Sequence, residues 1–158
     1  MIIFDADILS TFAKILRLDL IKKLFGKMYI TPMIKEELLA PLEYGYNFPS
    51  AILEGSIIVV PSESEIKSYN TLRAKLGKGE AEAISIAKNR KWLFATNDRV
   101  AQREAKENGV GIISLQAILK ALLERQLLLK DELIEIVREI RLKDNLVFTE
   151  DEIEKILG

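Results

Sequence analysis

Four acidic residues, far apart in the chain, fall near the ends of predicted strands and helices. They are Asp5, Glu37, Glu80 and Asp98. Asp5 and Asp98 each follow a short apolar run, whereas Glu37 and Glu80 lie near the starts of two predicted helices. Carboxylate oxygens are ligands that Mg²⁺ and Mn²⁺ prefer. We therefore expect these side chains to converge at one edge of a sheet and to bind a divalent ion.

The chain contains no His and no Cys, and this narrows the chemistry open to it. Without Cys there is no disulfide framework, thiolate zinc site or cysteine nucleophile, and without His there is no His-dependent triad or His-ligated metal. Hydrolytic chemistry must then come from carboxylates, a metal ion, Lys, Ser or Thr. The net charge of −1 gives no overall attraction to nucleic acid, so a polyanionic substrate needs a local basic patch.

Length and composition indicate one globular domain. The 158 residues are enough to bury a core, and 49% hydrophobic with 30% charged residues is ordinary for such a domain. No apolar run approaches the ~18 residues that span a bilayer, and Asp5 and Asp7 interrupt any signal peptide. We expect a cytoplasmic protein.

Short apolar runs alternate with segments of helical pattern along the chain. Strands are predicted at 2–5, 28–30, 57–60, 92–95 and 111–114. Helices are predicted within 8–25, from residue 32, and over 63–76, 80–89, 99–107, 115–124, 130–141 and 150–157, with a loop at 41–50. This alternation predicts a three-layer α/β/α fold with a mostly parallel sheet of about five strands. Residues 1–125 are expected to form the main domain, and 126–158 a helical C-terminal extension packed on it.

Each acidic residue also has a structural interpretation. Asp98 fits the N-cap of the helix that follows it, and Glu80 lies in a first helical turn, where the helix dipole favours a negative charge. Asp7 is either a supporting ligand or a cap, and Glu37 forms an ordinary solvated acidic pair with Glu36. These alternatives stay open for each residue taken singly.

The helical pattern around Glu80 bears on its role. Glu80 shares a helix face with the apolar Ala83 and Ile84, and this face should pack on the sheet, whereas Glu82 is expected to point away from it with Ser85. A carboxylate directed at the edge of a core needs a cation or several hydrogen-bond donors.

Four segments resemble the acidic motifs of PIN-domain nucleases in sequence, order and spacing. They are residues 2–9 (IIFDADIL), 31–38 (TPMIKEEL), 77–84 (GKGEAEAI) and 95–99 (ATNDR). The resemblance covers about residues 1–125, and the third segment is similar to that of prokaryotic PIN-domain proteins allied to the VapC toxins. It implies a PIN-like fold, a metal-dependent ribonuclease and a role as the toxin of a toxin–antitoxin pair.

The resemblance also implies a role for each matching residue. Asp5, Glu37, Glu80 and Asp98 match the ligands of one or two Mg²⁺ or Mn²⁺ ions, and Ser10, Thr96 and Asn97 match supporting polar positions near them. Asp7, a further supporting residue, stands where Asn or Ser is more common, and Ala101 stands where many relatives carry another Asp. These two departures leave the number of ions open. The implied products carry 5′-phosphate and 3′-hydroxyl ends.

Basic residues near the acidic motifs are candidates for contacts with RNA phosphates. Lys78 and Arg99 each lie within two residues of an acidic position, and Arg103 lies one helical turn beyond Arg99. Arg73 and Lys75 are candidates for the rim of the same patch. A single basic residue of this kind is more often an ordinary solvated surface charge.

The C-terminal helices are rich in apolar residues. Leu133, Ile134, Val137 and Ile140 form one stripe, which is expected to pack on the domain itself. A homodimer interface, or a groove for a helix of an antitoxin protein, is the alternative.

Two other functions compete with the nuclease. Asp5 and Asp7 after a strand also resemble the first motif of haloacid-dehalogenase-type phosphatases, but the Thr or Ser expected after the second Asp and the later acidic pair are missing. The second competitor is a non-catalytic module that keeps the PIN fold and binds RNA or a protein partner. Metal-dependent cleavage that disappears in Asp5→Asn separates the nuclease from this module.

Overall fold

Five strands and ten helices alternate in the computed structural model, which describes residues 1–158. The strands are β1 (Ile2–Phe4), β2 (Met28–Ile30), β3 (Ser56–Ile58), β4 (Leu93–Ala95) and β5 (Ile112–Ile113). The helices are α1 (Ala6–Lys14), α2 (Leu18–Phe25), α3 (Pro32–Glu43), α4 (Phe48–Gly55), α5 (Glu63–Leu72), α6 (Lys78–Arg90), α7 (Arg99–Glu107), α8 (Leu115–Glu124), α9 (Lys130–Asp144) and α10 (Glu150–Leu157). No helix is both long and apolar enough to cross a membrane.

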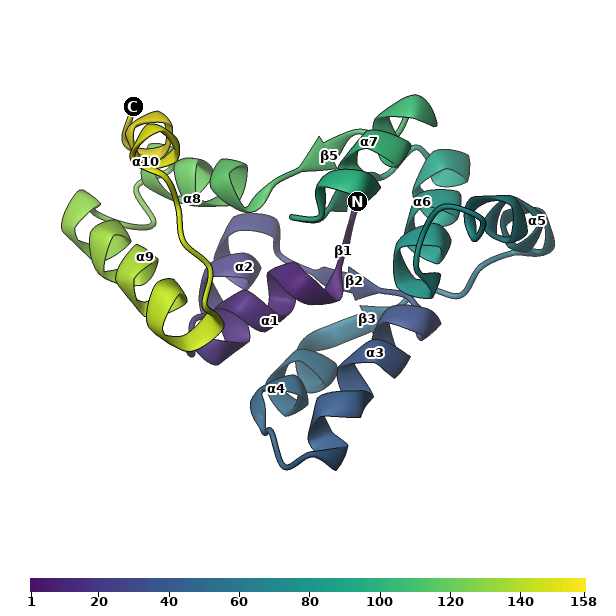
Figure 1. Ribbon diagram of the computed structural model, residues 1–158, viewed down its shortest axis with the longest axis horizontal. Coiled ribbons are helices and arrows are strands. Elements are labelled where there is room, and N and C mark those ends of the chain that lie inside the picture. The colour runs from purple at the N-terminus through teal and green to yellow at the C-terminus, as the bar shows by residue number, and fades with distance from the viewer.

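The strands form one parallel sheet in the order β3-β2-β1-β4-β5. In Figure 1, α2 and α8 lie on one side of this sheet, and α6 and α7 lie on the other. The predicted three-layer α/β/α fold is therefore confirmed. The strand order reverses between β1 and β4, and such a switch point leaves a crevice beyond the carboxyl ends of the strands, where ligands bind in open α/β sheets.

The central strands are apolar because helices cover both of their faces. Ile3, Phe4 and Phe94 have no exposed surface, and they join one continuous hydrophobic core. Helix α2 packs on β2, and α6 packs on β1 and β4. The middle of the sheet is thereby fixed on both sides, and the residues that follow β1 and β4 have a rigid support.

The carboxyl end of the sheet carries a row of helix N-termini. Asp5, Thr31, Asp98 and Ser114 follow four of the strands closely, and the side chain of each caps the next helix by accepting a backbone N–H. Helix N-termini carry partial positive charge, so this edge of the molecule favours negatively charged groups.

The predicted elements are present, but one region was assigned wrongly. The segment 41–50 is not a continuous loop, since α3 extends through Pro41 to Glu43 and α4 begins at Phe48. Pro41 lies in the last turn of α3, where a proline removes only one backbone hydrogen bond. Pro49 lies in the first turn of α4, a position that suits proline.

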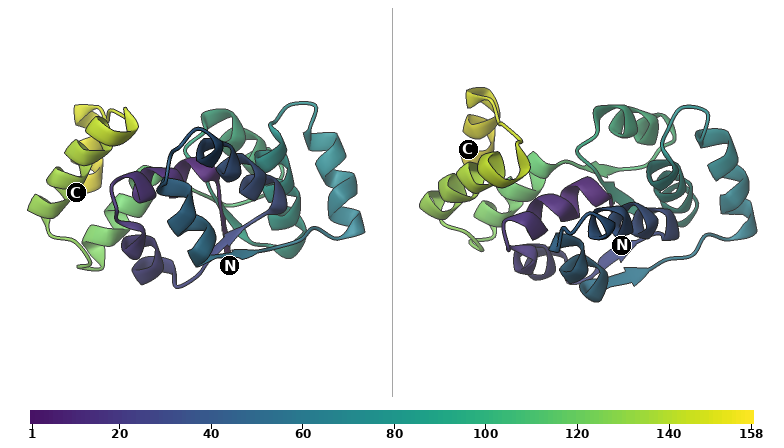
Figure 2. Two further views of the ribbon diagram at one scale, coloured as in Figure 1. Left: turned by 90° about the horizontal axis from the view of Figure 1, so that it is seen from below. Right: turned by 60° about the horizontal axis from the view of Figure 1, so that its bottom comes forward.

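The apolar stripe expected on the C-terminal helix also differs from the structure. Helix α9 packs on α1 and α8 through Leu133, Ile136 and Ile140, whereas Ile134 is 54% exposed. Ile134 and Val137 instead line a small apolar cavity of about 70 Å³ between α9 and α10. Figures 1 and 2 place α9 and α10 at the end of the molecule opposite α5.

Asp144, the last residue of α9, ties the C-terminal helices to α1. Its carboxylate accepts a hydrogen bond of 2.6 Å from the Thr11 hydroxyl and pairs with the Lys14 ammonium at 2.7 Å. Both partners lie on α1, one turn apart. The side chain of Asp144 is only 16% exposed, so this contact is partly shielded from water.

Removal of the Asp144 carboxylate should destabilise the chain. We expect Asp144→Ala to lower the free energy of unfolding by about 1–2 kcal/mol, because Thr11 and Lys14 lose a charged acceptor. Urea denaturation measures this change. Asp151→Ala is the matched control, since Asp151 and its partner Lys155 are 81% and 80% exposed, and the urea midpoint should stay nearly unchanged. Equal midpoints for both variants would contradict a role for Asp144 as a tether.

Candidate active site

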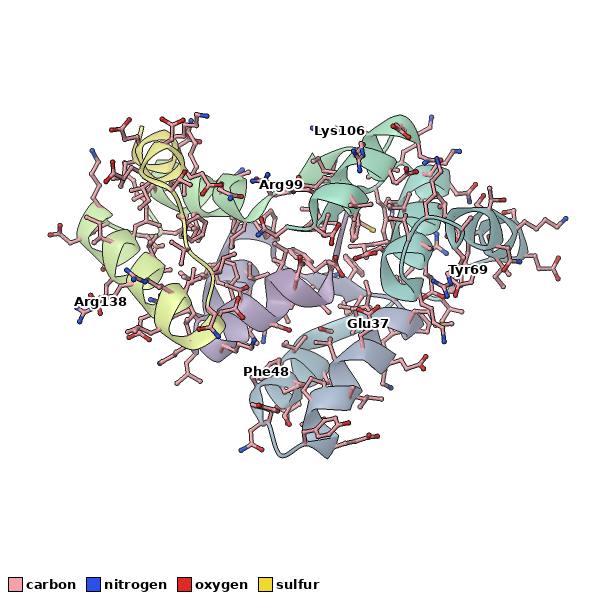
Figure 3. All side chains as sticks on the ribbon, in the orientation of Figure 1. Glu37, Phe48, Tyr69, Arg99, Lys106 and Arg138 are labelled. Atoms are coloured by element: carbon pink, nitrogen blue, oxygen red, sulfur yellow. The ribbon has the colours of Figure 1, made fainter.

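The four predicted acidic residues and Asp7 lie at the carboxyl edge of the sheet. Asp5 and Asp7 belong to the start of α1, and Asp98 caps α7. Glu80 lies in the first turn of α6, and Glu37 lies on the side of α3 that faces α1 and α6 (Figure 3). Each carboxylate accepts at least one backbone N–H near a helix N-terminus. The fold thus brings together residues separated by up to 93 positions in the chain.

Asp5 is the buried member of this carboxylate cluster, with 4% of its surface exposed. One carboxylate oxygen accepts the N–H of Ala6 at 2.8 Å, and the other accepts the hydroxyl of Thr96 at 2.7 Å. The register of the sheet explains the second contact, because Phe4 pairs with Ala95 and the next residues of both strands meet. Both oxygens of Asp5 are therefore oriented by the protein.

Asp7 and Asp98 approach each other across the loop after β4. Asp7 accepts the N–H of Ile8 at 2.6 Å and that of Asn97 at 3.1 Å. Asp98 accepts the N–H of Ala101 at 2.8 Å with Oδ1, which confirms the N-cap interpretation of this residue. Its Oδ2 has no hydrogen-bond donor in the protein and is free for a ligand.

Glu37 lies directly against the backbone of α6. Its Oε1 accepts the N–H of Gly79 at 3.1 Å, and a Cβ atom added to Gly79 would lie 2.6 Å from the same oxygen. Only glycine leaves room for the carboxylate at this position. The glycine at position 79 thus permits the close approach of Glu37 to the backbone of α6.

Glu80 is held in a similar way by the turn before its own helix. Its Oε2 accepts the N–H of Gly77 at 3.1 Å, so the capping interpretation of Glu80 holds for this oxygen. The other oxygen has no donor in the protein. Glu37, Glu80 and Asp98 therefore each offer one oxygen that no protein group occupies.

Glu82, expected to point away from the face of α6 that packs on the sheet, is nevertheless buried in the protein. Glu82 is 4% exposed and accepts the N–H of Met33 at 2.9 Å, in the first turn of α3. Helix α6 is buried along 81–87 because it packs against both α3 and α5 as well as the sheet. Glu82 and Glu37 thus form reciprocal contacts, in which each of the two helices supplies a carboxylate to the N-terminus of the other.

The carboxylates of the cluster raise one another's pKa. Burial is the largest cause for each of the four shifted members, and nearby negative charge adds to it. The pKa of Asp5 is raised well above its usual value by burial and by Asp7, and that of Asp7 is raised to about 6 by burial, Asp98 and Glu80. The pKa values of Glu37 and Glu80 are raised by burial and by the next carboxylate along the cluster. A divalent cation would relieve this repulsion.

The cluster does not form a ready coordination shell. No three acidic side chains of the chain bring their oxygens close enough together to hold one metal ion in this conformation. The convergence predicted from the sequence is thus partial: the residues share one edge, but their oxygens are spread around it. The donor set itself suits Mg²⁺ or Mn²⁺, because it consists of hard carboxylate oxygens and three of them have no protein donor.

The remaining predicted residues divide into three groups. The hydroxyl of Thr96 donates to Asp5, while Ser10 and Asn97 line a cleft of about 530 Å³ beside Asp7 and Asp98.

The basic residues predicted to contact RNA fall into a free set and an engaged set. Lys78, Arg99 and Arg103 are exposed and form no ion pair. Arg73 and Lys75 are engaged by the protein, since Arg73 donates to the carbonyl of Leu76 at 2.7 Å and Lys75 lies 3.6 Å from Glu104.

The fold is a parallel α/β/α sandwich with carboxylates at its switch point, where open α/β sheets bind their ligands. The model of one family, DUF3368, described as a PIN domain, matches residues 1–158, so the chain belongs to the PIN-domain family. No curated protein matches the chain. PIN domains are generally nucleases that use divalent metal ions, and the chain therefore has a nuclease-type fold.

The contact between Glu37 and Gly79 yields a first test of this site. We expect Gly79→Ala to lower nuclease activity by at least about tenfold, because the new methyl group displaces the Glu37 carboxylate and a shift near 1 Å has effects of this size. The melting temperature should change little, since alanine suits a helix better than glycine. Gly77→Ala is a graded control with a milder contact of 3.3 Å to Glu80. Equal activity in all three proteins would contradict the role of Gly79.

The raised pKa of Glu80 makes stability depend on pH. A carboxyl whose pKa is higher in the folded state binds more protons when folded, so the free energy of unfolding decreases as pH rises through that range. We expect Glu80→Gln without metal to raise the melting temperature by about 2 °C at pH 7.5, and the gain should vanish near pH 4. Glu152→Gln is the control, because Glu152 has the same position in the capping box of α10 outside the cluster. A gain that is the same at both pH values would contradict this account.

Proposed function

We propose that the protein is an Mg²⁺- or Mn²⁺-dependent endoribonuclease that hydrolyses RNA phosphodiester bonds. Asp5, Glu37, Glu80 and Asp98 are the proposed ligands of one or two ions. The observation that carries this proposal is the gathering of these carboxylates at the switch point of a PIN-domain sheet. The pKa values of Asp5, Glu37 and Glu80 are raised there, and Glu37, Glu80 and Asp98 each have one oxygen without a protein donor.

The protein's own groups prepare this edge for a cation and a phosphate. Thr96 orients Asp5, and the N–H groups of Gly77 and Gly79 hold Glu80 and Glu37 with one oxygen turned free. Fixed ligands lose little conformational freedom when an ion binds. When bound, the ion would polarise the phosphate and make a water molecule a better nucleophile.

Other residues support the same reaction in this proposal. Asp7, Ser10 and Asn97 shape the cleft beside the carboxylates, with Thr96 behind them. Lys78, Arg99 and Arg103 contact RNA phosphates, because they are exposed cations without an ion pair on α6 and α7, the helices that carry Glu80 and follow Asp98. Cleavage gives 5′-phosphate and 3′-hydroxyl ends.

We further propose a domain division, a cellular location and a protein partner for this chain. Residues 1–125 form the nuclease domain, and 126–158 form the helical extension. The chain acts in the cytoplasm as the toxin of a toxin–antitoxin pair, with an antitoxin or a second copy of the chain as its protein partner. A small DNA-binding protein encoded next to it would support the toxin role.

One observation favours a second candidate, a non-catalytic module that binds RNA or a partner. The spread of the acidic oxygens leaves no closed metal site in this conformation. The phosphatase alternative has less support, because the Thr or Ser expected after the second Asp and the later acidic pair are missing from the sequence.

RNA cleavage by the Asp5→Asn variant distinguishes a nuclease from a non-catalytic binding module. Asparagine keeps the shape of Asp5 and can still accept the N–H of Ala6, but it removes the charge. We expect cleavage of single-stranded RNA in Mn²⁺ to decrease by at least about 100-fold, and EDTA should abolish it in the wild type. Gel assays with labelled RNA and DNA oligonucleotides measure both effects. Asp151→Asn is the exposed control and should keep full activity. Full activity in Asp5→Asn, or activity that resists EDTA, would contradict the proposal.

A further inference from the structure

A second polar cleft adjoins the carboxylate cluster. It has a volume of about 510 Å³ and lies at the carboxyl ends of β4 and β5, where Asn97, Arg99, Gln102 and Gln116 line it. This second cleft shares Asn97 and Leu146 with the cleft beside Asp7 and Asp98. The two are therefore parts of one groove that crosses the ends of the strands from β1 to β5.

The outer wall of the second cleft comes from the C-terminal part of the chain. The linker between α9 and α10, residues 145–149, contributes Leu146, Val147 and Phe148. Figure 1 shows this linker running from the end of α9 near α1 to α10 above α8. Asp144 anchors the start of the linker on α1, so this wall is held in place without a ligand.

The polar groups of the second cleft have unused hydrogen-bonding capacity. The guanidinium of Arg99 and the side-chain amide of Asn97 have no partner in the protein. Gln102 donates to the carbonyl of Thr96 at 2.8 Å, and Gln116 donates to Glu152 at 3.1 Å, which leaves the amide oxygen of each free. Oriented amides with a free donor or acceptor can read the edge of a nucleobase.

We infer that the second cleft binds one nucleotide of single-stranded RNA, adjacent to the phosphate at the carboxylate cluster. Arg99 binds the phosphate of this nucleotide, and Gln116 and Asn97 bind the edge of its base. This inference rests on the proposed function, since it assumes that RNA is the substrate. The second cleft would be a nucleotide subsite of the proposed nuclease, and Gln116 and Asn97 would give it a preference for particular bases.

The dimensions of the second cleft favour a single strand over a duplex. A volume near 500 Å³ holds one ligand of nucleotide size, and the linker residues Leu146, Val147 and Phe148 form one wall of the cleft. Bases of single-stranded RNA can turn outward and offer their hydrogen-bonding edges, whereas paired bases in an RNA duplex are concealed in a deep, narrow groove. Arg99 is the only cation in the lining, and Glu152 places a carboxylate in the same lining, so the cleft suits a single phosphate beside Arg99 rather than a long duplex backbone.

Binding experiments with the full chain test this inference. The background is Asp5→Asn in Mg²⁺, so that RNA is not cut, and the probes are fluorescent six-nucleotide homopolymers of the four bases. We expect Arg99→Gln to weaken binding of all four about 3–10-fold and to reduce the salt slope by about 0.7. Gln116→Leu should make the affinities for the four homopolymers more alike, while the mean of the four affinities changes little. A duplex probe should bind at least about tenfold more weakly than a single strand.

Arg138→Gln is the matched control. Arg138 lies on α9, far from Arg99 in Figure 3, and its loss removes the same charge from an exposed arginine. This variant should leave both affinity and salt slope unchanged. Melting temperatures equal to that of the background show that the variants fold.

The outcomes separate the subsite from the nuclease activity. Effects of Arg99→Gln and Gln116→Leu as described support the subsite even where wild-type RNA cleavage is absent, and in that case only the proposed function fails. Unchanged affinity in Arg99→Gln, an unchanged base preference in Gln116→Leu, or equal binding of duplex and single strand overturns the inference even where cleavage is intact.

Discussion

Repulsion between clustered carboxylates is the constraint on which the functional edge depends. Five acidic side chains gather at this edge, and burial together with the neighbouring negative charges raises the pKa of four of them, Asp5, Asp7, Glu37 and Glu80. Such an arrangement destabilises the fold unless other groups compensate. The compensation comes from helix N-termini, because each carboxylate accepts a backbone N–H at the positive end of a helix. The parallel sheet supplies these ends, since every crossover starts a new helix at the same edge.

The same constraint explains how the surrounding helices are arranged. Helix α3 directs Glu37 to the N-terminus of α6, and α6 directs Glu82 to the N-terminus of α3, so the position of Glu37 depends on the packing of both helices. Gly79 permits this arrangement because any side chain there would meet Glu37. At the other end of the edge, Asp144 fixes the C-terminal helices on α1 and completes the groove. The C-terminal helices thus contribute to the site as well as to the core.

Much of the fold could be predicted from sequence, because short apolar strands alternating with helices admit few topologies. The edge position of Asp5 and Asp98 followed from strands that end just before them. The buried state of Glu82 could not be predicted, since it depends on α6 being covered by two helices as well as the sheet. The contact between Gly79 and Glu37 and the wall formed by residues 145–149 could not be predicted either. Both depend on the tertiary structure and have no recognisable pattern in the local sequence. The loop predicted at 41–50 is wrong because Pro41 and Pro49 do not exclude a helix. Pro49 lies in the first turn of α4, which suits proline, and Pro41 lies only in the last turn of α3.

The most direct test of the central claim is a crystal of the protein soaked in Mn²⁺, with an anomalous difference map. The account predicts one or two peaks among Asp5, Glu37, Glu80 and Asp98, with the free oxygens of the last three turned toward the ion. Glu37→Gln crystals soaked in the same way should show a weaker peak. A map without a peak at this edge, or with ions bound only elsewhere, would contradict the claim that these carboxylates form one cation site.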